Sequence, residues 1–382
     1  MKILLIPDKF KGSLSATEVV AALSNGIRRV YPEAVIDHIL ASDGGEGFLD
    51  AVSRNRRVEW VETMTSGPLG RPIQAYYLWD AEEQAAYVEM AMASGLELLT
   101  DEEKDPTKTT SWGTGLQIKD AIERGATDIY LGIGGSATND GGMGMAAALG
   151  YSFLDTSGNK LDAIGANLNQ LTKIIPPARA FSHVQFYALN DVNNPLYGSR
   201  GAAFVYAPQK GATTEQVHLL DAGLRKLEKV VLNDLGQDAA HLPGAGAAGG
   251  FSYGLKVFCN AHFLSGSRFI LQLAGAEKMI ETVNPDLIIT GEGKLDSQSL
   301  SGKMVQGVLG LSDIHKIPVV AFCGGLEISK EQAKAVGFYD VLEIGEKDRS
   351  LLYNLENAAT LLEGKSAEFM ARLKDQGFPT GL

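Results

Sequence analysis

The sequence predicts an α/β protein of two domains, and three observations support this fold class. Its 382 residues suit two domains of ordinary size. Short apolar runs alternate with amphipathic helical patterns at both ends of the chain, which is typical of a parallel sheet covered by helices. Near residue 66 the pattern changes to adjacent strands, and it returns to alternation before residue 286. These two changes mark candidate domain boundaries.

Charge and composition narrow the function classes. The formal net charge is −12, which argues against nucleic acid or an anionic membrane as the main partner. The two cysteines, Cys259 and Cys323, form no metal or disulfide pattern and fit a reducing compartment. The apolar run at the N-terminus is too short for a signal peptide, and no run approaches a membrane span. We therefore expect a soluble, cytoplasmic protein.

The first unit of the chain is a strand, a loop and a helix. Ile3–Ile6 is a short apolar run typical of a buried strand. Residues 15–18 form a capping box, Ser-Ala-Thr-Glu, that opens an amphipathic helix. The loop between them places Lys9 and Lys11 at the carboxyl end of the strand, where open α/β sheets bind their ligands.

An acidic turn follows the second predicted strand, residues 35–40. It reads Asp43-Gly44-Gly45-Glu46-Gly47 and opens a helix. Two carboxylates on a glycine-rich turn can hold a metal ion or a substrate hydroxyl. The alternative, which we weigh equally, is that Asp43 only caps the helix and Glu46 completes a capping box.

The stretch 132–144, GIGGSATNDGGMG, lies between a predicted buried strand at 128–131 and a helix at 145–149. Glycines let the backbone approach a ligand, and the N-terminus of the helix favours an anion such as phosphate or carboxylate. The same turn carries hydroxyl, amide and carboxylate groups on Ser136, Thr138, Asn139 and Asp140. The alternative is a tight turn in which Asn139 or Asp140 only caps the helix.

The middle of the chain adds a polar turn and a second basic turn. Residues 183–189 are expected to be a strand that ends at the polar turn 190–196, which contains Asn190 and Asp191. Residues 203–206 are expected to be a short strand before a turn that contains Lys210. Residues 214–235 have the spacing of an amphipathic helix.

Residues 244–249 match the pattern G-x-G-x-x-G. A dinucleotide site requires a strand directly before this pattern, and residues 237–242 do not resemble a strand. A flexible or substrate-facing loop is therefore favoured over a dinucleotide site.

The last hundred residues return to alternating strands and helices. Residues 286–290 are expected to be a strand that ends at a charged glycine-rich turn, which contains Gly291, Glu292, Lys294 and Asp296 and runs on to Lys303. Further strands are expected at 318–323 and 340–344, with helices from about 301, over 330–336 and from about 350 to 377.

Eight of these motifs together resemble the bacterial glycerate kinases of the glycerate 2-kinase type. In chain order they are PDKFKGSLSA (7–16), DGGEG (43–47), SGPLGRP (66–72), GIGGSATNDGG (132–142), NDVNNPL (190–196), PQKGA (208–212), PGAGAAGG (243–250) and TGEGKLDSQSLSGK (290–303). The resemblance covers nearly the whole chain in register.

The resemblance implies ATP-dependent phosphorylation of D-glycerate to 2-phosphoglycerate with Mg²⁺. It also implies two domains with the active site between them. In the implied arrangement, residues 1–65 and 282–382 are expected to form a three-layer domain on a doubly wound parallel sheet of the Rossmann or flavodoxin-like kind. Residues 66–281 are expected to form an inserted central α/β domain.

The chemistry of this reaction assigns hypothetical roles to the motif residues. A base is needed for the C2 hydroxyl of glycerate, and Asp191 is the first candidate and Asp296 the second, although either could only cap its turn. Lys294 completes the catalytic candidates. Candidates for binding glycerate or ATP are Lys9, Lys11, Ser136, Thr138, Asn139, Asp140, Asn190, Lys210, Gly291, Glu292 and Lys303. Candidate Mg²⁺ ligands are Asp43 and Glu46, with Asp140 and Glu292.

Three alternatives stay open on the sequence alone. The first two are a glycerate 3-kinase and a kinase for another small hydroxy acid. The third is a non-catalytic sensor of an anionic metabolite, which needs the anion turns but no base. The chain has no G-x-x-x-x-G-K-[ST] motif, so a P-loop enzyme is not expected. The oligomeric state is also open, a homo-oligomer included.

Overall fold

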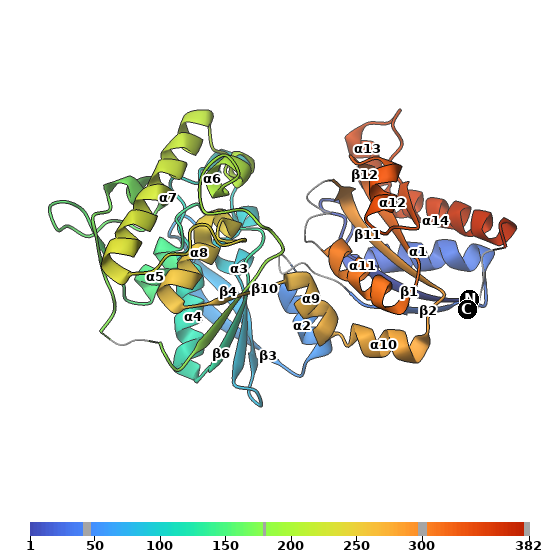
Figure 1. Cartoon of the computed structure of the whole chain (residues 1–382), viewed down its shortest axis with the longest axis horizontal. Coiled ribbons are helices and arrows are strands. Elements are labelled where there is room, and N and C mark those ends of the chain that lie inside the picture. The colour runs from blue at the N-terminus through green and yellow to red at the C-terminus, as the bar shows by residue number, and fades with distance from the viewer. Residues whose placement is uncertain (41–46, 179–180, 297–303, 378–382) are drawn as a thin grey trace. The chain divides into compact units, whose positions relative to one another are not determined.

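The computed structural model describes residues 1–40, 47–178, 181–296 and 304–377 (Figure 1). The chain divides into two compact units, each with its own sheet. The first, the two-ended unit, contains Met1–Asp43 and Ser267–Leu382, and the second, the central unit, contains Gly44–Gly266. In the described part of the chain, no helix is both long and apolar enough to cross a bilayer.

The two-ended unit is built on a five-stranded parallel sheet. Its strands are β1 (Lys2–Pro7), β2 (Val35–His38), β11 (Leu287–Leu295), β12 (Val319–Leu326) and β13 (Asp340–Glu343). They lie in the order β2-β1-β11-β12-β13, which is the flavodoxin-like one of the two doubly wound arrangements implied by the resemblance. In this arrangement the winding of the chain reverses between β1 and β11, the point at which such sheets bind ligands.

Helices cover this sheet because consecutive side chains on the central strands β1, β11 and β12 are apolar and buried. The helices are α1 (Ala16–Val30), α9 (Gly266–Leu273), α10 (Ala276–Val283), α11 (Met304–His315), α12 (Lys330–Ala335), α13 (Leu351–Glu356) and α14 (Ala358–Asp375). Ile3 and Leu5 pack with residues of α1 and α14, while the alternate residues Leu4 and Ile6 are also fully buried. Both faces of the strand are therefore covered.

The central unit is built on a six-stranded mixed sheet. Its strands are β3 (Glu59–Ser66), β4 (Pro72–Asp80), β5 (Ala85–Glu89), β6 (Asp128–Gly132), β9 (Gln185–Leu189) and β10 (His262–Leu264), and a separate hairpin is formed by β7 (Ser152–Leu154) and β8 (Lys173–Ile175). The order is β10-β9-β6-β5-β4-β3. Strands β3, β4 and β5 pair antiparallel, whereas β5, β6, β9 and β10 pair parallel.

The helices of the central unit pack mainly into one core. They are α2 (Phe48–Asn55), α3 (Ala91–Ser94), α4 (Trp112–Arg124), α5 (Met143–Ala148), α6 (Ala202–Tyr206), α7 (Thr214–Leu235) and α8 (Ala247–Cys259). The long helix predicted at 214–235 is α7, with a complete capping box at Thr213 and Gln216. Its buried leucines join the core under the sheet.

The limits of the compact units differ from the predicted boundaries at residues 65 and 281. Strand β3 pairs with β4 along its whole length, from Glu59 opposite Trp79 to Ser66 opposite Pro72. Helix α2 packs on the same sheet, with the Phe48 ring 6.4 Å from that of Tyr87. Residues from 47 to 65 therefore belong with the central unit, because a strand takes its sheet from its pairing partner.

Three predicted elements are corrected by the structure. Residues 202–206 form the helix α6 and not a strand, because this apolar segment packs between α7 and α8 and tertiary packing overrides β-propensity. The helix predicted from 350 to 377 is two helices that meet at Asn357. Asn357 caps the end of the first helix, and its backbone amide and its side-chain amide both donate to the Tyr353 carbonyl, at 3.0 and 2.9 Å.

The third correction concerns the end of β11. Gly291, Glu292 and Lys294 were expected in a turn, but they continue the strand and pair with β12 as far as Leu295 opposite Leu326. The glycines serve close packing here, since a Cβ on Gly293 would lie 3.0 Å from the Lys11 amide nitrogen.

Candidate active site

The parallel strands of the central unit end together at one edge of the sheet. Glu89 at the end of β5 lies opposite Gly132 of β6, which lies opposite Leu189 of β9. A row of stacked rings crosses the same strands, with Tyr130 4.6 Å from Tyr187 and 5.2 Å from Tyr87. Cross-strand aromatic pairs stabilise this register. The turns that follow β6 and β9 consequently begin side by side.

The glycine-rich turn, residues 133–142, follows β6 and is held by Asp140. This side chain is fully buried and accepts hydrogen bonds from the backbone and hydroxyl of Ser111 at 2.8 and 2.7 Å. It also accepts from the amides of Gly142 and Gly144 at 3.0 and 3.1 Å. Burial raises the pKa of Asp140 above its usual range, and these four bonds oppose that effect. The geometry is that of a carboxylate that caps α5, the alternative kept open above.

Lys210 joins the PQKGA segment to the glycine-rich turn. Its side chain is only 3% exposed, and Nζ donates to Ser136 Oγ at 2.8 Å and to the Thr138 carbonyl at 2.7 Å. Burial lowers the pKa of Lys210 to about 7, while the nearby Asp140 carboxylate acts in the opposite direction. The lysine therefore fixes the shape of the turn from the inside.

Apart from the exposed Pro243, the PGAGAAGG segment packs against the glycine-rich turn, and residues 247–250 belong to α8, so it is not the flexible loop expected from the sequence. Gly249 accepts a hydrogen bond at its carbonyl from the Gly141 amide at 3.1 Å. A Cβ on Gly249 would overlap the Thr138 carbonyl and lie 2.7 Å from Asn139 Cα. No strand lies between α7 and this segment, a stretch the structure describes in full, so the dinucleotide interpretation lacks its required context.

The polar turn 190–196 rests on the same PGAGAAGG segment. Asn190 Nδ2 donates to Ser252 Oγ at 3.4 Å, and a Cβ on Gly244 would lie 2.9 Å from Asn190 Oδ1. The Gly246 amide donates to the Asn194 carbonyl at 2.9 Å. Asp191 is half-buried and accepts a hydrogen bond from Ser265 Oγ at 2.6 Å. The four motifs at 132–142, 190–196, 208–212 and 243–250 thus pack into one polar group in the central unit.

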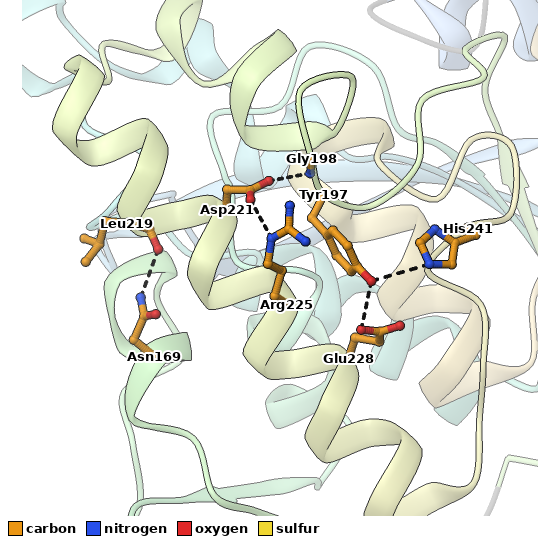
Figure 2. A network of polar contacts seen from close by, with 8 residues as sticks. All are labelled: Asn169, Tyr197, Gly198, Leu219, Asp221, Arg225, Glu228 and His241. Carbon is orange, nitrogen blue, oxygen red and sulfur yellow. Dashed lines mark hydrogen bonds and ion pairs between the residues drawn. The ribbon is translucent and has the colours of Figure 1, made fainter.

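A polar network anchors the chain directly after the polar turn (Figure 2). Arg225 of α7 lies 4.2 Å from the centre of the Tyr197 ring and donates to Asp221 at 2.9 Å. Asp221 also accepts from the Gly198 amide at 2.6 Å, and the Tyr197 hydroxyl donates to Glu228 at 3.1 Å. The loop is therefore fastened to a long, rigid helix, which limits its freedom next to Asp191.

Two buried side chains of the glycine-rich turn have polar atoms without a partner among the described residues. They are the hydroxyl of Thr138 and both amide atoms of Asn139, and both residues are 0% exposed. Unpaired buried polar atoms cost about 1–3 kcal/mol each, so a bound water or ligand is expected to satisfy them.

The two-ended unit brings together a second set of candidate residues at the switch point of its sheet. The loop that follows β1 contains Lys9 and Lys11, and the Asp8 amide donates to the Gly291 carbonyl of β11 at 2.8 Å. Glu292 and Lys294 lie further along β11. Lys294 forms an ion pair with Glu327 at 2.7 Å, and this hydrogen bond raises the pKa of Lys294. Asp296 follows the end of the strand.

The described residues do not form a metal centre. Within residues 1–40, 47–178, 181–296 and 304–377, no three His, Cys, Asp or Glu side chains are grouped to hold an ion. Four donors already occupy the Asp140 carboxylate. The candidates Asp43, Glu46 and Lys303 lie outside the described residues.

Three residues that support the polar group or its neighbouring elements in the central unit were not predicted from the sequence. Ser111 was not identified as a site residue, but its hydroxyl donates to Asp140. Glu89 is 2% exposed and accepts from the amides of Gly47 and Leu49, so it caps α2 from the neighbouring strand. Ser265 was not singled out at all. Of the three, only Glu89 is marked in the sequence, because it is a charged residue at the end of an otherwise apolar strand.

Fold and site define an α/β protein whose polar groups collect where parallel strands end, the position at which open sheets bind small ligands. A model of the glycerate kinase family matches residues 3–374. The chain is 40% identical over 330 residues to glycerate 2-kinase of Escherichia coli K12, covering 85% of this chain and 86% of the relative. It is 37% identical over 369 residues to glycerate kinase of Halalkalibacterium halodurans, covering 94% and 95%.

A solved structure agrees with these relatives. The crystal structure assigned to glycerate kinase 2 of Salmonella typhimurium LT2 is 36% identical, with a TM-score of 0.78 and 99% of each chain covered. The chain belongs to the glycerate kinase family, and it is a kinase. The predicted family and the α/β fold class are thereby confirmed, and the relatives favour an enzyme over a non-catalytic sensor.

Proposed function

We propose that this kinase transfers the γ-phosphoryl group of ATP to the C2 hydroxyl of D-glycerate, with ADP, 2-phosphoglycerate and a proton as products. The observation that carries the proposal is the packing of four family motifs into one polar group in the central unit. The 40% identity to a relative named glycerate 2-kinase supports the position of transfer. A glycerate 3-kinase and a kinase for another hydroxy acid are the alternatives.

Asp191 is the proposed base. It lies in the polar turn where β9 ends, and the network around Tyr197 and the PGAGAAGG segment holds this turn on both sides. Its carboxylate would accept the proton of the C2 hydroxyl as the oxygen attacks the γ-phosphorus. The bond from that phosphorus to the β,γ-bridging oxygen breaks, and ADP leaves.

Cationic and amide groups would bind the anionic parts of the substrates. The glycerate carboxylate and the ATP phosphates require positive charge or N–H donors. Asn139 offers both a buried donor and a buried acceptor to such a ligand. Lys9 and Lys11 supply positive charge at the switch point of the other unit. No step is assigned to Mg²⁺.

The activity itself is tested by ADP release on mixing the protein with D-glycerate, ATP and Mg²⁺. We expect release with D-glycerate and background release without an acid. Phosphorus–proton NMR coupling in the product then separates position 2 from position 3. A product phosphorylated at C3, or release only with another hydroxy acid, would replace the proposal by the corresponding alternative.

The role of Asp191 is tested by Asp191→Asn. We expect kcat to fall by about 10²–10⁴-fold because a general base is lost, with an unchanged thermal midpoint because the amide keeps the size of the side chain. Glu123→Gln, on a side chain that is 67% exposed on α4, is the matched control and should retain full turnover. Near-normal turnover in Asp191→Asn removes Asp191 from the role.

A further inference from the structure

Two polar side chains lie together where the parallel strands β9 and β10 end. The two strands pair in parallel register, with Leu264 opposite Leu189. The ladder continues by one bond, from the Asn190 amide to the Leu264 carbonyl at 3.1 Å. Ser265 directly follows the last residue of β10, and Asp191 directly follows Asn190, the first residue after β9. The sheet itself therefore sets the separation of these two side chains.

The hydrogen bond between these side chains is short. Ser265 Oγ donates to Asp191 Oδ1 at 2.6 Å, a length typical of a hydroxyl that donates to an ionised carboxylate. Such a bond restricts rotation of the carboxylate about its own axis. The preceding Asn190 is fixed as well, since its Oδ1 accepts from the Val192 amide at 3.3 Å and its Nδ2 donates to Ser252.

We propose that Ser265 is a positioning residue for phosphoryl transfer, which holds the Asp191 carboxylate in the orientation that accepts the substrate proton. The inference rests on the proposed role of Asp191. A carboxylate has about four lone-pair sites on its two oxygens, so a bond from Ser265 to Oδ1 is compatible with a further bond from a substrate hydroxyl. Ser265 touches the base and not the reacting atoms.

The test combines two substitutions at Ser265 with a double-mutant cycle. Ser265→Ala removes the hydroxyl, and Ser265→Thr keeps it. We expect Ser265→Ala to lower kcat by about tenfold, because a base that is free to rotate spends less time in line with the hydroxyl. The KM values for D-glycerate and ATP should stay unchanged. Ser265→Thr should recover most of the lost turnover.

The cycle separates orientation of the base from a structural contribution. In the Asp191→Asn background the carboxylate is gone, so Ser265→Ala should lower kcat no further. An equal loss in both backgrounds would overturn the inference, as would wild-type turnover of Ser265→Ala while Asp191→Asn remains impaired. Normal turnover of Asp191→Asn alone would instead refute the proposed base. Thermal midpoints of all variants identify any loss that comes from unfolding.

Discussion

At the scale of single residues, Lys210 links stability to pH. Its pKa in the folded protein is about 7, below its ordinary value of 10.5. Between these two values the unfolded chain holds the extra proton, so the free energy of unfolding rises with pH across this window. Below pH 7 both states are protonated, and the penalty for burying the charge is at its full size. A neutral amine still has two N–H groups for Ser136 and Thr138.

Lys210→Met should remove this dependence. We expect the stability of the natural protein relative to Lys210→Met to increase from pH 7 to pH 10, measured as the free energy of unfolding in urea. Lys119→Met, on a side chain that is 53% exposed, controls for the loss of a positive charge and should give a flat difference. A flat difference for Lys210→Met as well would contradict a depressed pKa.

The residues of the site also show what the sequence could predict. Ser136, Thr138, Asn139 and Asp140 were identified because they lie in one glycine-rich turn after a strand. Ser111 and Ser265 join the group from segments 29 and 74 residues away from their partners, and nothing in their local sequence marks them. Local patterns predict turns and caps, whereas contacts between distant segments follow from the packing of the sheet.

At the scale of elements, the PGAGAAGG segment shows why several glycines are needed side by side. Gly249 has a φ of +67°, and a Cβ there would overlap the Thr138 carbonyl. The same φ occurs at Gly236, which ends α7 and has open space around its Cα. The pair therefore separates backbone strain from steric overlap.

Gly249→Ala should destabilise the protein much more than Gly236→Ala. A left-handed alanine costs about 1–2 kcal/mol at either position. At Gly249 the overlap adds a further cost of roughly 1–3 kcal/mol and displaces the glycine-rich turn. We expect both variants to lower the unfolding midpoint in urea, Gly249→Ala by more, and only Gly249→Ala to raise KM. Equal losses of stability for the two variants would show that steric overlap at Gly249 adds no cost.

The errors of element prediction also have a physical cause. The glycines of β11 and the aromatic run of α6 were interpreted from local propensity, and in both cases neighbouring elements decided otherwise. The helix at 214–235 was predicted with its observed limits, because a long amphipathic pattern depends little on neighbouring segments, and the structure adds a capping box at its start.

At the scale of the whole molecule, the two units have separate cores. Phe186 lies in the core of the central unit and Phe369 in that of the two-ended unit, and each is 1% exposed. Replacing either by alanine costs about 3–5 kcal/mol through lost contacts and a cavity. Each substitution should lower the stability of its own unit and leave that of the other unit unchanged.

Calorimetry tests this independence. We expect two unfolding transitions, with Phe186→Ala lowering one midpoint and Phe369→Ala lowering the other. A single transition that both variants move equally would show that the units unfold as one. The predicted limit at 65 is tested by the same method, since a core variant at Val61 should act with Phe186.

The sheet order of the two-ended unit has a consequence for biosynthesis. Strand β1 pairs with β2 on one side and with β11 on the other. Strand β11 begins roughly 250 residues after β2 ends. At about 5–20 residues per second, a ribosome needs on the order of 10–50 s to deliver that partner. Throughout this interval the nascent β1 presents an unpaired edge and uncovered apolar side chains. The central unit can complete its own sheet meanwhile, whereas the sheet of the two-ended unit can be completed only after β11, β12 and β13 have been synthesised.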